Sequence, residues 1–394
     1  MFLYLKKKSP RNYNNYFYKM FNVYKYFNDI TELKEYATNN DISNIIVHLR
    51  NTFTNDDIVN NIDIFKKIQK LRCAVTQITE IPISFVNLQY LDCSYTKISW
   101  IPKELINLQY LDCSYTKISW IPKELINLQY LDCSDTQITE IPGFFNNLTY
   151  LNCSNSKITK IPTSFVNLQV LYCNNTQIVE IPKELVNLQV LYCNSTQIVE
   201  IPKELVNLQK LDCSGTQITD IPISFVNLQY LGCSESITEI PKEFVNLQAL
   251  YCSRTQITEV PKEFNNLRIL YCTRTQIKEI PKELVNLIFI DCDKNTQITE
   301  IPKELVNLQV LYCNDTQIKE VPKELINLQE LHCYRTMITE IPETLDLLVC
   351  IESDFINIPR HKENVLKYKN EIKDIIKRNN NLNDDVNTLI CSYI

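Results

Sequence analysis

The stretch LQYLDCSYTKISWIPKELIN occupies residues 88–107, and residues 108–127 repeat its twenty letters without one change. Diverged copies of this unit run from residue 62 to residue 358, and each carries a landmark cysteine. Fourteen such cysteines recur every 20 residues, except that the interval is 19 after Cys233 and 21 after Cys292. A tandem unit of this length predicts a solenoid, because one coil cannot bury its apolar side alone and stacked coils share a core.

Each unit is expected to contain one short strand, a turn and an abbreviated return. In the second exact copy, Leu111 and Cys113 alternate with Tyr110 and Asp112, which is the period of a strand. Pro122 and its counterparts cannot donate to a strand ladder, so they predict a bend or turn on the return path. Both irregular intervals fall directly after the cysteine, where a surface loop tolerates a change of length.

The repeated pattern resembles the leucine-rich repeat family in its short, 20-residue form. The unit LxxLxCxxTxIxxIPxxLxN matches that family's LxxLxLxxNxLxxLPxxLxx almost position for position, over about 300 of the 394 residues. The resemblance implies an α/β fold class. The expected architecture is a leucine-rich repeat solenoid with a curved parallel β-sheet on its concave face, short turns or 3-10 segments on its convex face, and helical end caps.

Two positions of the unit depart from the family pattern. Cysteine stands where the family often has leucine or valine. Threonine stands where the family usually has an asparagine that bonds loop backbone between coils, and threonine makes such a bond more weakly. A separate asparagine column begins at Asn87, Asn107 and Asn127 and continues to Asn327. Our hypothesis is that this column supplies the missing backbone bonding on the return side.

The repeats divide the chain into an array and its flanks. Residues 1–27 contain six Lys/Arg and no acidic residue, and directly after them Asp29 and Glu32 resemble a helix capping box. After the array, apolar residues recur at helical spacing over 360–378. The predicted domains are a basic and aromatic N-terminal tail (1–27), a helical N-terminal cap (28–61), a repeat array of fourteen clear repeats plus a degenerate last one (62–358), and a helical C-terminal cap (359–394).

The landmark cysteines are expected to be buried free thiols. Adjacent parallel strands lie about 4.8 Å apart, so neighbouring cysteines would stack in a column inside the core. The sequence contains no CxxC pair of the kind that zinc sites use, and disulfide scaffolds are typical of small secreted domains. Thiols that act as small hydrophobes indicate a reducing compartment, either the nucleus or a cytoplasmic location that includes the cytoplasm of a host cell.

Composition argues against catalysis and cofactor binding. The chain has only 3 Gly and 3 His, all dispersed, so no phosphate-binding glycine loop, His-based metal site or catalytic triad is expected. No metal, cofactor or small-molecule substrate is therefore predicted. The first apolar residues precede Lys6, Lys7 and Lys8, the reverse of a classical secretory signal. No run reaches the roughly 18 apolar residues of a transmembrane segment.

The outward strand positions are the predicted partner-binding surface. Partners of leucine-rich repeat proteins usually bind the concave strand face, and these positions are expected to be free of core packing. In the units from Cys93 to Cys333, 11 of the 39 outward residues are Tyr, which supplies stiff amphipathic contact area. Tyrosine also suits strand surfaces in general, and duplication copies it whether or not it is used. The predicted partner-binding residues are Tyr90, Asp92, Tyr110, Asp112, Tyr130, Asp132, Tyr150, Tyr172, Tyr192, Tyr230, Tyr251, Arg254, Tyr271, Arg274, Tyr312 and Arg335.

This surface changes character along the array. The N-terminal repeats alternate tyrosine with aspartate, and Tyr95 and Tyr115 add aromatic area where the strands end. In the C-terminal repeats Arg254, Arg274 and Arg335 stand at the same exit position. A partner of mixed charge could be held in one orientation by this asymmetry.

The leading interpretation is a non-catalytic protein-protein interaction module or scaffold, acting as a monomer on a protein partner. Near-identical coils offer only copies of each side chain, whereas catalysis needs unique residues. One alternative is a substrate-recruiting subunit or effector for a ubiquitin ligase or another host-directed enzyme. A second is nucleic-acid or membrane contact through residues 1–27, although the net charge of −6 makes nucleic acid an unfavourable partner. Cys391 leaves lipidation of the chain end open.

Overall fold

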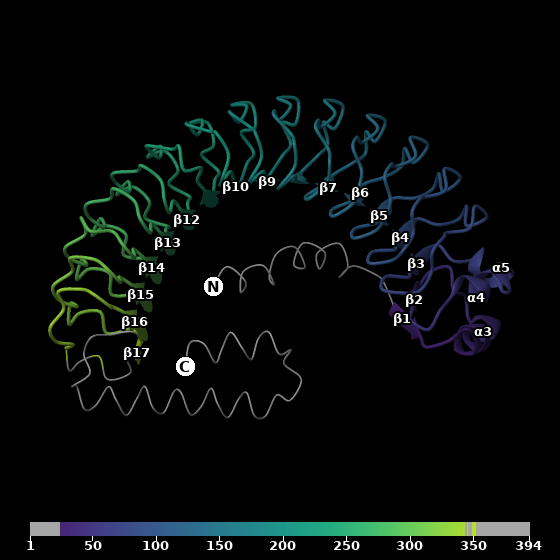
Figure 1. Ribbon diagram of the computed structural model, residues 1–394, viewed down its shortest axis with the longest axis horizontal. Helices are drawn as coiled ribbons and strands as arrows, with labels where there is room; N and C mark the ends of the chain where they lie inside the picture. The colour runs from purple at the N-terminus through teal and green to yellow at the C-terminus, as the bar shows by residue number, and fades with distance from the viewer. Residues whose placement is uncertain (1–23, 343–344, 346–348, 352–394) are drawn as a thin grey trace. The chain divides into compact units, whose positions relative to one another are not determined.

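The computed structural model describes residues 24–342, residue 345 and residues 349–351. The chain divides into two compact units, residues 1–198 and residues 199–394. Within each unit the strands lie side by side along the inner edge of a curve, and the return segments lie along its outer edge (Figure 1). The first part of the predicted tail, the predicted C-terminal cap and Cys391 lie outside the described residues.

In the first unit, the described residues contain nine strands that pair in parallel and in chain order. Two strands and three short helices come first: β1 (Tyr24–Phe27), α3 (Ile30–Asn39), β2 (Ile46–Leu49), α4 (Asn55–Val59) and α5 (Ile62–Phe65). The repeat strands follow as β3 (Lys70–Arg72), β4 (Tyr90–Asp92), β5 (Tyr110–Asp112), β6 (Tyr130–Asp132), β7 (Tyr150–Asn152), β8 (Val170–Tyr172) and β9 (Val190–Tyr192).

The second unit continues the same pattern with eight strands among its described residues, again parallel and in chain order. They are β10 (Lys210–Asp212), β11 (Tyr230–Gly232), β12 (Ala249–Tyr251), β13 (Ile269–Tyr271), β14 (Phe289–Asp291), β15 (Val310–Tyr312), β16 (Glu330–His332) and β17 (Val349–Ile351). Equivalent residues of consecutive repeats face each other, as Leu231 faces Leu250, so each repeat position forms a row across the sheet.

Each coil closes around a small apolar core. In the coil of β5, Leu111, Cys113, Ile118 and Leu125 are fully buried. The chain reverses in tight turns at the proline, where the Leu125 amide donates to the Pro122 carbonyl at 3.2 Å. Over residues 70–342 the return segments consist of turns and bends without any helix. The predicted parallel solenoid with short turns on its outer side is confirmed.

The landmark cysteines form the inner row next to the strands. All fourteen, from Cys73 to Cys333, are free and buried. Several thiols donate to the strand carbonyl of the next coil, as from Cys213 Sγ to the Gly232 oxygen at 3.2 Å. Burial raises the pKa of the Cys252 thiol to about 12, because the thiolate would lose its hydration. The prediction of buried free thiols is confirmed, and a thiol with a raised pKa such as that of Cys252 is held in the unreactive, protonated form.

Threonine and asparagine side chains make different hydrogen bonds to the backbone. The Thr116 hydroxyl donates to the Cys113 carbonyl of its own coil at 2.6 Å, so it shapes the turn without linking coils. The Asn127 amide instead donates to the Ile106 carbonyl of the preceding coil at 2.8 Å. The hypothesis of a bonding asparagine column on the return side is confirmed. The asparagines that make this bond include Asn87, Asn107, Asn127, Asn147, Asn167, Asn187, Asn227, Asn246, Asn266, Asn286, Asn307 and Asn327.

The segment before the repeats is more than a helical cap. Helix α3 begins where the capping signal predicts, with the Glu32 amide donating to Asp29 Oδ1 at 3.0 Å. The structure adds strands β1 and β2, which extend the repeat sheet upstream and were not expected from the sequence. Among the described residues, no helix has the length and apolar character that crossing a bilayer would require.

Candidate protein-binding surface

Tyrosine rings stack along the strand face of the first unit. Tyr90, Tyr110, Tyr130 and Tyr150 face one another in register. Their successive ring centroids are 4.2, 4.1 and 4.1 Å apart and the ring planes are nearly parallel. In-register strands lie about 4.8 Å apart, so identical flat side chains at one position stack. We call this set the tyrosine row.

The stacking corrects one expectation from the sequence. The outward strand positions were expected to be free of packing, but the rings of the tyrosine row pack against each other. Tyr90 and Tyr150 are each only 8% exposed, and Tyr110 and Tyr130 are half-buried. At β8 and β9 the tyrosine moves to the next outward position, and Tyr172 meets Tyr150 edge-on with centroids 5.8 Å apart. A partner therefore reaches the edges of the half-buried rings more readily than any ring face.

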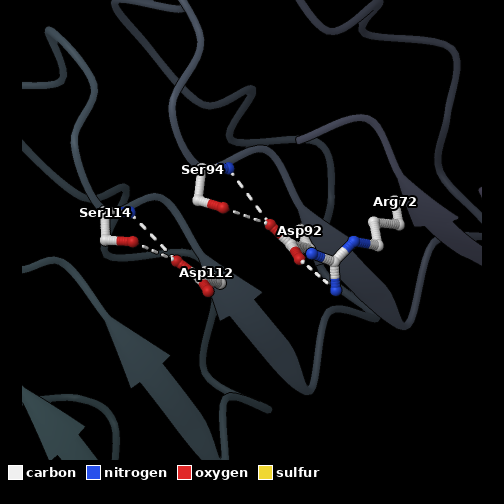
Figure 2. Close-up of polar contacts among 5 residues, drawn as sticks. All are labelled: Arg72, Asp92, Ser94, Asp112 and Ser114. Atoms are coloured by element: carbon white, nitrogen blue, oxygen red, sulfur yellow. Dashed lines mark hydrogen bonds and ion pairs between the residues drawn. The ribbon is translucent and has the colours of Figure 1, made fainter. Parts of the chain in front are cut away.

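A column of aspartates runs beside the tyrosine row. Asp92, Asp112 and Asp132 occupy equivalent positions of β4, β5 and β6. Each accepts two hydrogen bonds from the serine two residues later. Figure 2 shows this for Asp92, whose Oδ1 accepts from the Ser94 amide at 3.1 Å and from its hydroxyl at 2.7 Å. We call these three residues the aspartate column.

The two ends of the aspartate column are neutralised differently from its middle. Arg72 in β3 forms an ion pair with Asp92, with 3.2 Å between Nη1 and Oδ2 (Figure 2). At the other end the Asn152 amide donates to Asp132 Oδ2 at 3.0 Å. Asp112, between them, is bonded only by the Ser114 amide and hydroxyl among the contacts of the described residues. The middle of the column thus has no cationic partner there.

Burial and like charge act together on the aspartate column. The pKa of Asp112 is raised well above its ordinary value by burial first, and then by the negative charges of Asp132 and Asp92. The pKa of Asp132 is also raised, again mainly by burial, against the opposing effect of its hydrogen bonds. A cation placed beside Asp112 would relieve both effects, so this face is electrostatically complementary to a positively charged ligand.

We expect Asp112→Asn to stabilise the protein near neutral pH by about 1 kcal/mol, which is roughly 2–4 °C in Tm for a unit of this size. The amide keeps an oxygen for the Ser114 donors and removes the repelled charge. Because the folded-state pKa is raised, the wild type loses stability as pH rises from the ordinary aspartate range through the folded-state pKa. The advantage of the variant should therefore vanish in acid.

Urea unfolding between pH 3.5 and 8, followed by circular dichroism, measures this difference. Asp63→Asn is the matched control, because its carboxylate is exposed and lies 3.8 Å from an exposed Lys66 amine. The control should change stability little at any pH. A loss of stability in Asp112→Asn at neutral pH would contradict the account of the column.

The residue at the strand exit of most coils has a left-handed backbone. In the first unit φ is 62° at Val75, 54° at Tyr95 and Tyr115, and 57° at Ser195. This region costs an L-residue roughly 1–2 kcal/mol and favours glycine. Yet Gly215 is the one glycine with positive φ among the described residues. The conformation turns each side chain outward, leaving Tyr95 56% and Tyr115 48% exposed, with their rings stacked at 4.3 Å.

In the second unit the same exit position carries basic side chains. Arg254, Arg274 and Lys294 have φ between 56° and 64° and are exposed. Arg335 also has positive φ, but its Nη1 lies 3.6 Å from Asp315 and its guanidinium lies over the Tyr334 ring. Arg254, Arg274 and Lys294 therefore form a basic edge beside the second strand face.

The strand face of the second unit is also aromatic. Rings follow one another along β11 to β16, with centroids 5.0 Å apart between Tyr230 and Tyr251 and 4.7 Å apart between Tyr251 and Tyr271. At the far end the Tyr312 hydroxyl donates to Glu330 Oε1 at 2.8 Å. The four tyrosines are half-buried, so this face offers more accessible ring area than Tyr90 or Tyr150.

The structure separates the predicted site residues by accessibility. Those whose side chains are buried are Tyr90, Asp92, Asp132, Tyr150 and Tyr172. Those that are half-buried are Tyr110, Asp112, Tyr130, Tyr192, Tyr230, Tyr251, Tyr271 and Tyr312, and the exposed ones are Arg254, Arg274 and Arg335. Arg72 was missed by the sequence analysis. Aligning the strand letters KLR with YLD places it at the aspartate position, and that signal would have found it.

Comparisons with known proteins identify the repeat and the fold. A family model described as Leucine Rich repeats (2 copies) matches residues 126–165 and 186–225. No curated protein matches the chain. The functional domain of InlJ from Listeria monocytogenes, described as including a cysteine ladder, is 24% identical with a TM-score of 0.68, over 73% of this chain and 69% of that one.

Two further solved structures are similar. The leucine-rich repeat protein LIC12759 of Leptospira interrogans is 24% identical with a TM-score of 0.63, over 84% of this chain and 89% of that chain. The internalin InlF of Listeria monocytogenes is 26% identical with a TM-score of 0.59, over 66% of this chain and 85% of that chain. These similarities show a shared solenoid fold.

Proposed function

Because this chain is a leucine-rich repeat protein, we propose that it is a non-catalytic interaction module that binds a protein partner through its strand faces and strand exits. The observation that carries the proposal is the left-handed exit position. Tyr95, Tyr115, Arg254 and Arg274 hold a backbone conformation that glycine would adopt at lower cost. A strained position that keeps a large exposed side chain suggests that the side chain is used.

The buried and exposed residues would have different roles in this binding. The tyrosine row and the aspartate column give a rigid, prearranged surface, and rigidity reduces the entropy lost on binding. The exposed pair Tyr95 and Tyr115 would supply contact area on the first unit. The basic edge of Arg254, Arg274 and Lys294 would supply charge on the second. Aromatic and arginine side chains are the ones that most often dominate interface energies.

The chemistry of the interior supports a reducing location such as the cytoplasm. Fourteen thiols lie buried in one chain, and several of their Sγ atoms donate to backbone carbonyls. Oxidation of any of them during transient opening would add bulk or polarity to a close-packed core. We therefore propose that the protein acts where thiols are kept reduced.

The binding proposal is tested with two pairs of substitutions. Proteins captured by the wild-type chain are purified, and their affinity is measured for Tyr95→Ser with Tyr115→Ser, and for Arg254→Glu with Arg274→Glu. We expect at least one pair to weaken binding about 30-fold, which corresponds to roughly 2 kcal/mol. The effect of the arginine pair should shrink at high salt.

Matched controls carry the same chemical changes on the return side. Ile106→Ser with Ile126→Ser removes exposed apolar area from the first unit, and Lys262→Glu with Lys282→Glu reverses exposed charge on the second. Both controls should bind as the wild type does. Unchanged affinity in both test variants, or losses confined to the controls, would refute the proposed surface.

A further inference from the structure

The first strand face lacks positive charge in the place where it would be most stabilising. Arg72 forms an ion pair with Asp92 at one end of the aspartate column, but Asp112 has no cationic partner among the described residues. A second irregularity lies close by in the sheet. The buried Tyr150 hydroxyl has no hydrogen-bond partner of ordinary geometry within the described residues, although the Tyr130 ring stacks beside it. Both features are typical of a surface that another segment completes.

The chain itself contains a segment with the complementary chemistry. Residues 1–23 contain five Lys/Arg, no Asp or Glu, and seven Tyr or Phe. The basic residues can pair with carboxylates, and the aromatic ones can pack on the tyrosine row or offer partners to a hydroxyl. Cations also bind favourably over tyrosine rings.

The position of this segment allows it to reach the column. It joins β1 at Tyr24, and β1 is four strands away from β5, which carries Asp112. Four strand spacings amount to about 19 Å. Lys19 and Arg11 precede Tyr24 by 5 and 13 residues, and an extended chain covers about 3.3 Å per residue. These two residues can therefore lie up to roughly 16 and 43 Å from Tyr24. The distance of about 19 Å across four strand spacings falls between the two values.

We propose that residues 1–23 bind the strand face of the first unit in cis, with lysine or arginine side chains beside Asp112 and Asp132, and that they occupy the surface a partner would use. The attachment at Tyr24 makes this binding intramolecular, so that it depends on an effective concentration, which is of millimolar order for sites joined by a short connection. A contact of weak intrinsic affinity is therefore enough to keep the face covered. It offsets only part of the repulsion at Asp112, so the stabilisation expected for Asp112→Asn is reduced but keeps its sign. The competition with a partner rests on the function proposed above, whereas the contact itself does not.

Limited proteolysis of the full chain tests the contact. Trypsin cleaves after Lys and Arg, and mass spectrometry reports the rate of cleavage after Arg11 and Lys19. We expect Asp112→Lys to speed this cleavage about tenfold over the wild type, because the segment is repelled. Raising the salt concentration from 50 to 500 mM should speed the cleavage of the wild type as well, because the charge pairs are screened.

Further variants distinguish a lost contact from a misfolded repeat array. The combined change Lys6→Glu, Lys7→Glu and Lys8→Glu leaves the repeat array untouched and should also speed cleavage after Arg11 and Lys19. Asp112→Asn, which removes charge without adding bulk, should have a smaller effect in the same direction. Asp220→Lys reverses an exposed charge in the second unit and should leave the rate unchanged.

Three results would overturn the proposal. The first is equal cleavage in the wild type, Asp112→Lys and the Lys6–Lys8 variant. The second is protection in the wild type that high salt does not reduce. The third is protection that appears only as protein concentration rises, which would assign the contact to a second copy of the chain. No external partner enters this test, so its failure is distinguishable from failure of the binding experiment above.

Discussion

Replacing Asn295 with alanine is expected to destabilise the second unit by about 2–3 kcal/mol. Asn295 stands in the coil with the extra residue and is 1% exposed. Its amide group donates to the Cys272 carbonyl at 2.9 Å and to the Thr275 hydroxyl at 3.0 Å. Its oxygen accepts from the Thr275 amide at 2.8 Å. Alanine would leave the buried Thr275 amide unsatisfied and open a small void beside it.

This residue restores a link that threonine does not provide. In other described coils the equivalent hydroxyl donates to a carbonyl of its own coil, as Thr316 does to Cys313. Asn295 reaches back to the preceding coil on the strand-exit side, so it joins two coils at the point where the repeat is irregular. The insertion after Cys292 is what brings an asparagine into this position.

Urea unfolding monitored by circular dichroism gives the change in free energy. The control is Asn286→Ala, which removes one exposed bond of 2.7 Å to the Asn265 carbonyl and should cost about 1 kcal/mol or less. If the two variants lose the same stability, Asn295 is merely another member of the return-side column. A larger loss at Asn295 supports its role as a buried bridge.

The second large effect is expected at Arg72. Arg72→Met should destabilise the first unit by about 2 kcal/mol, less than the cost for a fully buried ion pair because the Arg72 side chain is 37% exposed. The Asp92 side chain is only 4% exposed and pairs with Arg72 at 3.2 Å. Methionine retains the apolar stem but leaves a buried carboxylate beside the negative charges of Asp112 and Asp132.

A double-mutant cycle isolates this electrostatic contribution. Asp92→Asn removes the charge that Arg72 neutralises, so Arg72→Met should cost much less in that background, and the coupling energy should exceed about 1 kcal/mol. Lys66→Met is the control, because its ion pair with Asp63 is exposed and 3.8 Å long. An Arg72→Met loss that is the same in both backgrounds would show that packing, rather than charge, is the cause.

The core of the array could be read from the sequence because its signals are local and repeated. Leu111 and Cys113 alternate with polar neighbours, and Pro122 marks a turn in every copy. The asparagine column could be anticipated for the same reason, since a polar residue retained at one position of every coil needs a recurrent partner. Asn127 and its counterparts have that partner in the carbonyl of the preceding coil.

The candidate site could be predicted only in part. Its residues were identified, but their accessibility depends on distances between coils that the unit pattern does not contain. Tyr90 and Tyr150 are buried by their neighbours, whereas Tyr95 and Tyr115 are exposed because the exit backbone is left-handed. Strands β1 and β2 were missed because each is a single short run without a repeat to reinforce it.

By itself, the sequence determined that the coils stack in register and that thiols face inward, because a twenty-residue period leaves each coil no other way to bury its leucines. Tertiary structure alone decided the electrostatic state of the strand face. Arg72, Asp92, Asp112 and Asp132 come from four different coils, and only parallel pairing about 4.8 Å apart brings their charges within interacting distance. Charge interaction depends on separation in space and on burial, neither of which a single repeat encodes.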